Sequence, residues 1–180
     1  MKDKGQIVEI LASSSLYNED VLNFLTKKEE LIWYSTPKTY DLFDGILIGG
    51  HQGIENFKLG QRRKTSSGGH QLPLYVISID QNENRIFVGA GNNHPGLLVK
   101  VLRILKKDLQ LEDTDTFFLN NNFEPVVVKV YFDEEYLLDN VKLYYDKEEL
   151  FLEFPESINI YKYKNASIYH NETFLATINI

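Results

Sequence analysis

The sequence predicts an α+β protein made mostly of β-structure, in which a small central α/β module is followed by a C-terminal antiparallel β-barrel. Two observations predict this class. Short runs of apolar and β-branched residues alternate with polar turns over most of the chain, and only one segment carries a clear helix start. The 180 residues are 43% hydrophobic and 13% aromatic, which is ample for a folded core. We expect two modules, 1–95 and 96–180.

The first module is expected to begin with a short helix. Asn18-Glu19-Asp20 precedes the apolar residues Val21, Leu22, Phe24 and Leu25, so acidic residues fall in a first turn, where the helix dipole favours them. The helix is expected to end before Trp33. Pro37 and the stretch 41–50 break further regularity, and Asp44-Gly45 is a good turn.

A β-hairpin is the strongest local prediction. Residues 74–80 alternate and are rich in β-formers, 81–84 form a polar turn, and 85–89 return as Arg-Ile-Phe-Val-Gly. The apolar spacing of 97–111 is compatible with a helix or a long strand, and we favour a strand for 97–105.

From residue 117 onward the pattern is almost entirely typical of strands. Acidic and polar turns separate six short apolar or alternating runs. Six strands at this spacing predict a small antiparallel barrel. The predicted strands are 126–132, 141–145, 150–154, 158–163, 166–169 and 173–180.

Composition excludes several kinds of chemistry. With no cysteine, these residues cannot form a disulfide, a thiolate metal site or a cysteine persulfide. The four histidines stand far apart, so we expect no metal site and no cofactor. No apolar run approaches a membrane-spanning length and the start has no leader-like segment, so a cytoplasmic protein without a membrane partner is expected.

The net charge of -7 is unevenly distributed along the chain. Residues 1–55 hold five Lys/Arg against nine Asp/Glu, and residues 108–180 hold five against fifteen. Residues 56–107 have the opposite balance, with nine basic residues against two acidic ones. Such a basic island can bind a polyanion locally while the acidic remainder limits non-specific binding.

Several motifs in succession resemble the tRNA-specific 2-thiouridylase family. The run from Asp44 to Ile54 is similar to the family pattern Asp-Gly-x-Val-x-Gly-x-His-x-Gly, and Leu59-Gly60-Gln61-Arg62-Arg63 is similar to its Gly-Gln-Arg motif. Gly91 to Pro95 and the closing residues 166–176 continue the likeness, which covers roughly 40–180. The sequence departs from the pattern at Lys58, where Thr is usual, and at Tyr163-Lys164-Asn165, where a Pro-Gly-Gln turn is usual.

The resemblance implies a part of a tRNA-modifying protein. In that family an N-terminal ATP-pyrophosphatase domain adenylates the wobble uridine, a cysteine pair handles sulfur, and a central domain and C-terminal barrel help to hold the tRNA. This sequence has no Ser-Gly-Gly-x-Asp-Ser loop and no cysteine, so we expect neither that domain nor any catalytic residue here. The resemblance therefore implies a non-catalytic tRNA-binding module.

The residues expected to contact RNA centre on one loop. Glycine permits close backbone approach, guanidinium groups bind phosphate in a bidentate manner, and a glutamine can hydrogen-bond sugar or base edges. From chemistry alone a solvated basic loop is an equal alternative, and the resemblance favours RNA. The candidates are Lys58, Gly60, Gln61, Arg62, Arg63, Lys64, His51, Lys100 and Arg103.

Each outlying candidate has a structural alternative. His51 and His94 stand next to glycine turns and could fix corners through their own ring nitrogens, and Lys100 and Arg103 could lie on an ordinary solvated face. Two other functions stay open. The chain could dock a separate ATP-pyrophosphatase and sulfur-transfer subunit of a split enzyme, or the barrel could be reused for protein–protein interaction.

Overall fold

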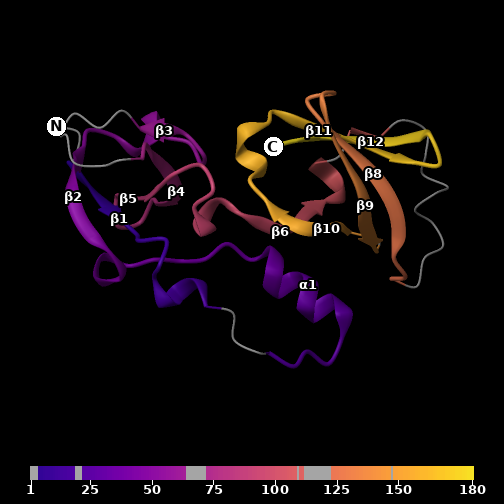
Figure 1. Ribbon diagram of the computed structural model, residues 1–180, viewed down its shortest axis with the longest axis horizontal. Helices are drawn as coiled ribbons and strands as arrows, with labels where there is room; N and C mark the ends of the chain where they lie inside the picture. The colour runs from indigo at the N-terminus through magenta and orange to yellow at the C-terminus, as the bar shows by residue number, and fades with distance from the viewer. Residues whose placement is uncertain (1–3, 19–21, 64–71, 109, 112–122, 147) are drawn as a thin grey trace. The chain divides into compact units, whose positions relative to one another are not determined.

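The computed structural model describes residues 4–18, 22–63, 72–108, 110–111, 123–146 and 148–180. The chain divides into two compact units. Unit 1 comprises 1–22 and 37–98, and unit 2 comprises 23–36 and 99–180. Each unit contains one curled sheet rich in antiparallel pairing, so the mostly β fold class is confirmed (Figure 1). Among the described residues, no helix is long and apolar enough to cross a membrane.

The sheet of unit 1 has the strand order β2-β1-β5-β4-β3. Strand β1 pairs with β5 in parallel and with β2 in antiparallel orientation, and the remaining pairs are antiparallel. The predicted hairpin is confirmed as β4 and β5. The strands are β1 Gly5–Glu9, β2 Ile46–His51, β3 Arg62–Arg63, β4 Leu74–Asp80 and β5 Arg85–Ala90. The 3₁₀ turns are η1 Ser15–Tyr17, η2 Leu42–Asp44, η3 Ile54–Asn56 and η4 Pro95–Leu97.

The core of unit 1 lies under the three inner strands. Fully buried aliphatic side chains of β1, β4 and β5 pack together, and Phe57 and Ile54 cover them from the segment before β3. These buried residues are Ile7, Leu74, Val76, Ile86 and Val88. The outer strands β2 and β3 carry mainly exposed or half-buried residues, which places the motif residues at the two edges of the sheet.

The sheet of unit 2 has the strand order β6-β10-β9-β8-β11-β12-β7, and all of its pairs are antiparallel. The choice of a strand at 97–105 is confirmed by β6. The strands are β6 Val99–Leu105, β7 Gln110–Leu111, β8 Val126–Phe132, β9 Tyr136–Tyr145, β10 Glu149–Ile158, β11 Asn165–His170 and β12 Thr173–Asn179. The 3₁₀ turns are η5 Lys106–Asp108 and η6 Ile160–Lys162.

One predicted element of the second half differs from the structure. The strand predicted at 158–163 is wrong, because β10 ends at Ile158 and the turn η6 follows, capped by the Asn159 side chain, which accepts a hydrogen bond from the Tyr161 amide. The β11–β12 hairpin closes on Asn171-Glu172, both at positive φ, as a type I′ turn requires. Asparagine tolerates this left-handed conformation better than most residues, which suits Asn171 to the turn.

The predicted helix lies further along the chain than expected. Residues 22–26 are not helical, and α1 spans Lys27–Ser35, so it includes Trp33. Its start is fixed by Thr26, whose hydroxyl accepts from the Glu29 amide at 3.2 Å while the Glu29 carboxylate accepts from the Thr26 amide at 3.2 Å. This reciprocal cap outweighs the acidic residues at 18–20 as a start signal.

Helix α1 packs on the sheet of unit 2 through one apolar contact and several ion pairs. Leu31 is fully buried against residues of β6, β9 and β10, namely Val101, Tyr144 and Phe151. Around this contact Lys27 reaches Glu153 at 2.9 Å, and Lys28 reaches Asp146 at 2.5 Å and Glu149 at 3.1 Å. A segment that precedes most of unit 1 in the sequence is therefore an integral part of unit 2.

The ion pairs make the docking of α1 sensitive to acid. Burial favours the neutral form of Glu153, but the hydrogen bond and the charge of Lys27 outweigh burial and lower the pKa of this carboxyl. A lowered folded-state pKa contributes stability above the unfolded value of about 4.3, and the contribution is lost as pH falls through the folded pKa. The pair therefore stabilises the fold at neutral pH and ceases to do so in the acid range below about pH 4.

We expect Glu153→Gln to lower the free energy of unfolding by about 1 kcal/mol at pH 7, because the partly solvated pair with Lys27 is lost. At pH 3 the difference from wild type should shrink. Thermal denaturation at several pH values, followed by the fluorescence of Trp33, the single tryptophan, measures both effects. Glu156→Gln, an exposed change on the same strand, is the control. A deficit of equal size at pH 7 and pH 3 would contradict the assignment.

Candidate nucleic-acid interface

The loop that carries the Gly-Gln-Arg motif is tied to itself and to the sheet. The Lys58 amide donates to the Gln61 side-chain oxygen at 2.8 Å, and the Gln61 amide donates to the Lys58 carbonyl at 3.1 Å. Gly60, at φ +73, donates its amide to the Val76 carbonyl at 2.8 Å, and the Val76 amide donates to the Gln61 carbonyl at 3.0 Å. A left-handed residue is needed at the turn, which explains the glycine. The loop is therefore an ordered extension of β4.

The two arginines that follow point to opposite sides of the edge strand β3. Arg62 is exposed and Arg63 is half-buried, as alternation along a strand requires. A side chain at Gly49 would come within 3.9 Å of the Arg63 guanidinium, so this group lies near β2, the opposite edge of the same sheet. The curl of the sheet therefore brings β2 and the Arg63 side chain together, and burial lowers the pKa of Arg63.

Three cations of this loop are without an acidic partner in the part of the chain that the structure describes. Lys58, Arg62 and Arg63 form no ion pair there. Arg85, by contrast, bonds to Gln6 at 2.8 Å and pairs with Glu83 at 3.3 Å. The positive charge of Lys58, Arg62 and Arg63 is thus available to an external anion.

Lys64, the last predicted contact of this loop, lies outside the described residues. Two further predicted RNA contacts do not belong to the loop. Lys100 and Arg103 are in unit 2, where Lys100 donates to the Pro155 carbonyl at 2.9 Å and Arg103 pairs with Glu149 at 2.5 Å. Both cations therefore already serve contacts within β6 and β10.

His51 is buried at the end of β2, with only 6% of its surface exposed. Its Nδ1 accepts a hydrogen bond from the Gly53 amide at 3.3 Å, and Nε2 donates to the Asn84 carbonyl at 3.2 Å. A side chain on Gly5 would lie 2.0 Å from Nε2, so the ring rests directly on the backbone of β1. Both ring nitrogens are used within unit 1, which supports a structural role.

His94 repeats this arrangement at the end of the hairpin. It is 2% exposed, its Nδ1 accepts from the Gly96 amide at 3.1 Å, and Nε2 donates to the Ile10 carbonyl at 3.0 Å. A side chain on Gly89 would lie 2.5 Å from the ring. Burial lowers the pKa of His94, which keeps the ring neutral at neutral pH. The interpretation of His94 as a structural corner is confirmed.

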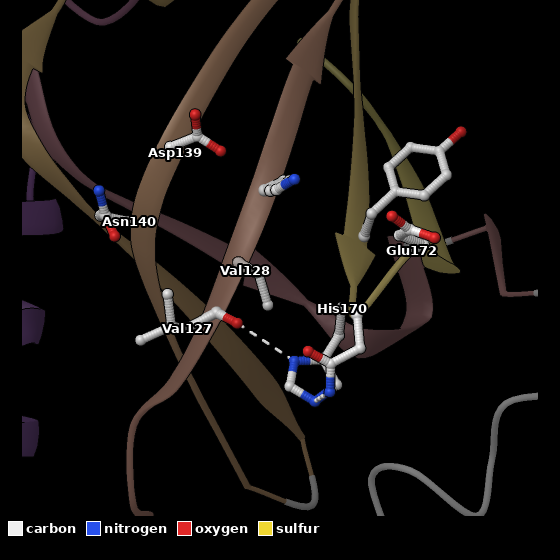
Figure 2. A pocket seen from close by; sticks show the side chains of 9 residues that line it. Val127, Val128, Asp139, Asn140, His170 and Glu172 are labelled. Carbon is white, nitrogen blue, oxygen red and sulfur yellow. Dashed lines mark hydrogen bonds between the residues drawn. The ribbon is translucent and has the colours of Figure 1, made fainter.

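Unit 2 contains an open hollow of about 440 Å³ between β8, β9 and the β11–β12 turn. Figure 2 shows His170 in this hollow, where Nδ1 donates to the Val127 carbonyl at 3.1 Å. The charged residues of the lining are Lys129, Asp139 and Glu172. Two carboxylates against one ammonium group do not favour a polyanion. No group of three or more possible metal ligands occurs among the described residues.

Sequence reasoning missed an exposed apolar surface on unit 1. It consists of Leu11, Phe43 and Ile46, which line one open surface hollow and are 50%, 93% and 54% exposed. Phe43 is presented by the turn η2, which the Asp41 and Asp44 side chains cap reciprocally, so its position is fixed by local hydrogen bonds. The stretch 41–50 was expected to break regularity, but residues 46–51 form β2, and the sheet order shows that β2 is an edge strand.

The contact between His51 and Gly5 makes a sharp prediction. Gly5→Ala would place a methyl group inside the imidazole ring and should lower the free energy of unfolding by about 2–3 kcal/mol. Gly50→Ala, where a side chain would lie 3.1 Å from the Gly5 carbonyl, should cost less. Urea denaturation of both variants measures the difference. Equal stability of Gly5→Ala and wild type would show that the ring does not rest on β1.

Comparison with known proteins locates the loop within a recognised domain. Residues 34–90 match the family model described as the tRNA methyl transferase PRC-barrel domain. The chain is 39% identical over 106 residues to the tRNA-specific 2-thiouridylase MnmA of Christiangramia forsetii, covering 59% of this chain and 27% of that protein. It is 35% identical over 117 residues to the Flavobacterium johnsoniae protein of the same name, covering 61% and 30%.

A third relative extends the same result. The MnmA protein of Karelsulcia muelleri is 38% identical over 106 residues, covering 59% of this chain and 26% of that protein. The chain thus spans between a quarter and a third of the length of the curated relatives it matches. The resemblance predicted from the sequence motifs is confirmed: over more than half of its residues this chain is similar to part of the tRNA-specific 2-thiouridylases.

Proposed function

We propose that this chain is an RNA-holding module related to tRNA modification, which binds tRNA through the loop 58–64 of unit 1. The relatives are named as tRNA-specific enzymes, and the loop falls inside the matched domain at 34–90. The contacts are assigned to Lys58, Gly60, Gln61, Arg62 and Arg63, with Lys64 as an extension. Lys100 and Arg103, predicted as further contacts, would add to this surface only by leaving their partners in unit 2.

The observation that carries the proposal is the set of cations without acidic partners on an ordered loop. A guanidinium group in contact with carboxylates is poorly available to phosphate, but Arg62 and Arg63 have no carboxylate partner among the described residues. Gly49 and Gly60 leave the neighbouring backbone open to close approach. Gln61 uses its side-chain oxygen to close the loop, so its amide nitrogen is the group left to donate to RNA.

The proposed role of these residues is binding. They contain no cysteine, so none of them can carry sulfur as a persulfide. In the hollow of unit 2, both ring nitrogens of His170 are used by hydrogen bonds with Val127 and Asn171. Binding without chemistry is therefore the function that the geometry supports best.

Binding to tRNA should be weak to moderate and should fall steeply with salt, because affinity comes from a few phosphate contacts. Arg62→Ala with Arg63→Ala should weaken binding about tenfold or more at low salt and reduce the slope of log Kd against log salt by about 2. Fluorescence anisotropy with labelled tRNA across a salt series measures both quantities.

The control removes the same charge elsewhere. Lys38→Ala with Lys129→Ala lowers the net charge by the same amount at two exposed positions that are not part of the loop. This variant should bind tRNA nearly as wild type does. Equal loss in both double variants would mean that net charge alone matters, and absence of tRNA binding by the wild type at low salt would refute the proposal.

The exposed apolar surface of Leu11, Phe43 and Ile46 favours a second candidate function, docking of a separate catalytic subunit. Apolar patches of this kind on an otherwise folded unit mark interaction sites. In this alternative the chain is one subunit of a split thiouridylase. A third possibility is reuse of unit 2 for protein–protein interaction, and unit 2 has exposed apolar residues of its own, among them Leu25, Trp33 and Val127.

Phe43→Ser should abolish co-elution of the chain with a purified ATP-pyrophosphatase-type chain, because a large exposed anchor is lost. Leu25→Ser is the matched control, since Leu25 is equally exposed at 93% but lies in unit 2. Size-exclusion chromatography of the mixtures gives the result. Absence of a complex with wild type, or equal loss in both variants, would exclude docking through this surface.

A further inference from the structure

Three aromatic rings gather at one end of unit 2. Phe132, which is fully buried, stacks on Tyr163 with centroids 4.8 Å apart, and Tyr163 lies 5.7 Å from Tyr136 with an interplanar angle of only 10°. Tyr136 begins β9 and is 38% exposed, and Tyr163 is half-buried. We call the two near-parallel tyrosine rings the aromatic floor. Phe132 supports the floor from the core side.

A lysine lies over the floor. The ammonium nitrogen of Lys162 is 4.9 Å from the Tyr163 centroid and 5.6 Å from the Tyr136 centroid, within the range of cation–π attraction. Lys162 is exposed and forms no ion pair within the described chain. Neither tyrosine hydroxyl has a hydrogen-bond partner among the described residues. The aromatic faces and hydroxyl groups of the two tyrosines therefore lie next to the ammonium group of Lys162.

The floor is held rigidly by an aspartate. The Asp133 carboxylate accepts from the Lys164 amide at 2.9 Å and from the Asn165 amide at 3.0 Å, and the Asp133 amide donates to the Asn165 carbonyl at 3.1 Å. These bonds join the turn before Tyr136 to the segment that contains Tyr163. A ligand that stacks here does not have to order the rings first, which lowers the cost of binding.

The local charge selects the kind of ligand. Glu134 and Glu135 are exposed next to Tyr136 in the sequence, and with Asp133 they outnumber Lys162 and Lys164 by three charges to two. A long polyanionic track is therefore not favoured, whereas one flat uncharged group with a single adjacent phosphate is. An unpaired nucleobase has this chemistry, because every base offers a π-face and its own phosphate can reach Lys162.

We propose that the aromatic floor of Tyr136 and Tyr163 is a binding site for an unpaired nucleobase of RNA. The base stacks on the tyrosine rings, the hydroxyl groups donate to its edge, and Lys162 moves from the rings to the neighbouring phosphate. This site lies in unit 2 and uses stacking, whereas the loop 58–64 lies in unit 1 and uses charge. The floor adds an RNA contact to the proposed function but does not depend on that loop.

The test uses the full chain and a labelled oligouridine, free or annealed to oligoadenosine, with binding followed by fluorescence anisotropy. Tyr136→Leu keeps apolar bulk but loses the ring and should weaken binding of the single strand about tenfold. Tyr136→Phe keeps the ring and should bind within about twofold of wild type. Tyr131→Leu is the matched control, because Tyr131 lies on β8 in an edge-on pair with Tyr169 rather than a parallel one.

The salt dependence separates this site from the loop. In a background with Arg62→Ala and Arg63→Ala, the remaining oligouridine binding should change little with salt and should still be lost in Tyr136→Leu. Unchanged tRNA binding in this background, with oligouridine binding also intact, would refute the loop alone. Thermal denaturation shows whether wild type and Tyr136→Leu are both folded. Equal binding by the two folded proteins would overturn the nucleobase site and leave the floor as a protein-contact surface. Preference for the duplex over the single strand would overturn it as well.

Discussion

The imidazole of His51 is the contact on which the candidate interface of unit 1 depends. Its two nitrogens join the end of β2 to the turn between β4 and β5, and its ring lies against Gly5 of β1. The Phe57 ring packs edge-on against this imidazole, with the ring centroids 5.6 Å apart. The Gly-Gln-Arg loop follows Phe57 directly in the sequence. The basic loop is thus placed by a buried, uncharged corner that itself offers nothing to a ligand.

Much of the fold follows from local patterns, and its exceptions have local causes. Alternation was sufficient for β8, because only one of its faces is buried. Strand β5 is buried on both faces and could be predicted from its run of apolar residues. The helix was placed too early because acidic residues at 18–20 look like a first turn, whereas the reciprocal bonds of Thr26 and Glu29 fix the true start. The division of the chain into modules 1–95 and 96–180 stays a prediction.

The candidate site was predictable where it is local and not where it depends on pairing in space. The loop residues follow one another in sequence, so their chemistry could be recognised directly. The pairing of Arg103 with Glu149 across β6 and β10 could not be seen, nor could the edge position of β2 that exposes Ile46 and Leu47. The aromatic floor also joins residues from separate strands, with Tyr163 at a position where the sequence departs from the pattern it resembles.

The assignment of 23–36 to unit 2 has a consequence for biosynthesis. A nine-residue helix is too short to be stable alone in water, and the surface that stabilises α1, formed by Tyr144 and Phe151, is synthesised much later than the helix itself. During translation the α1 segment must therefore remain unfolded while residues 37–98, the larger part of unit 1, emerge after it. Unit 1 can complete its sheet during this time, but unit 2 can close only after its last strands leave the ribosome and the early segment is recovered.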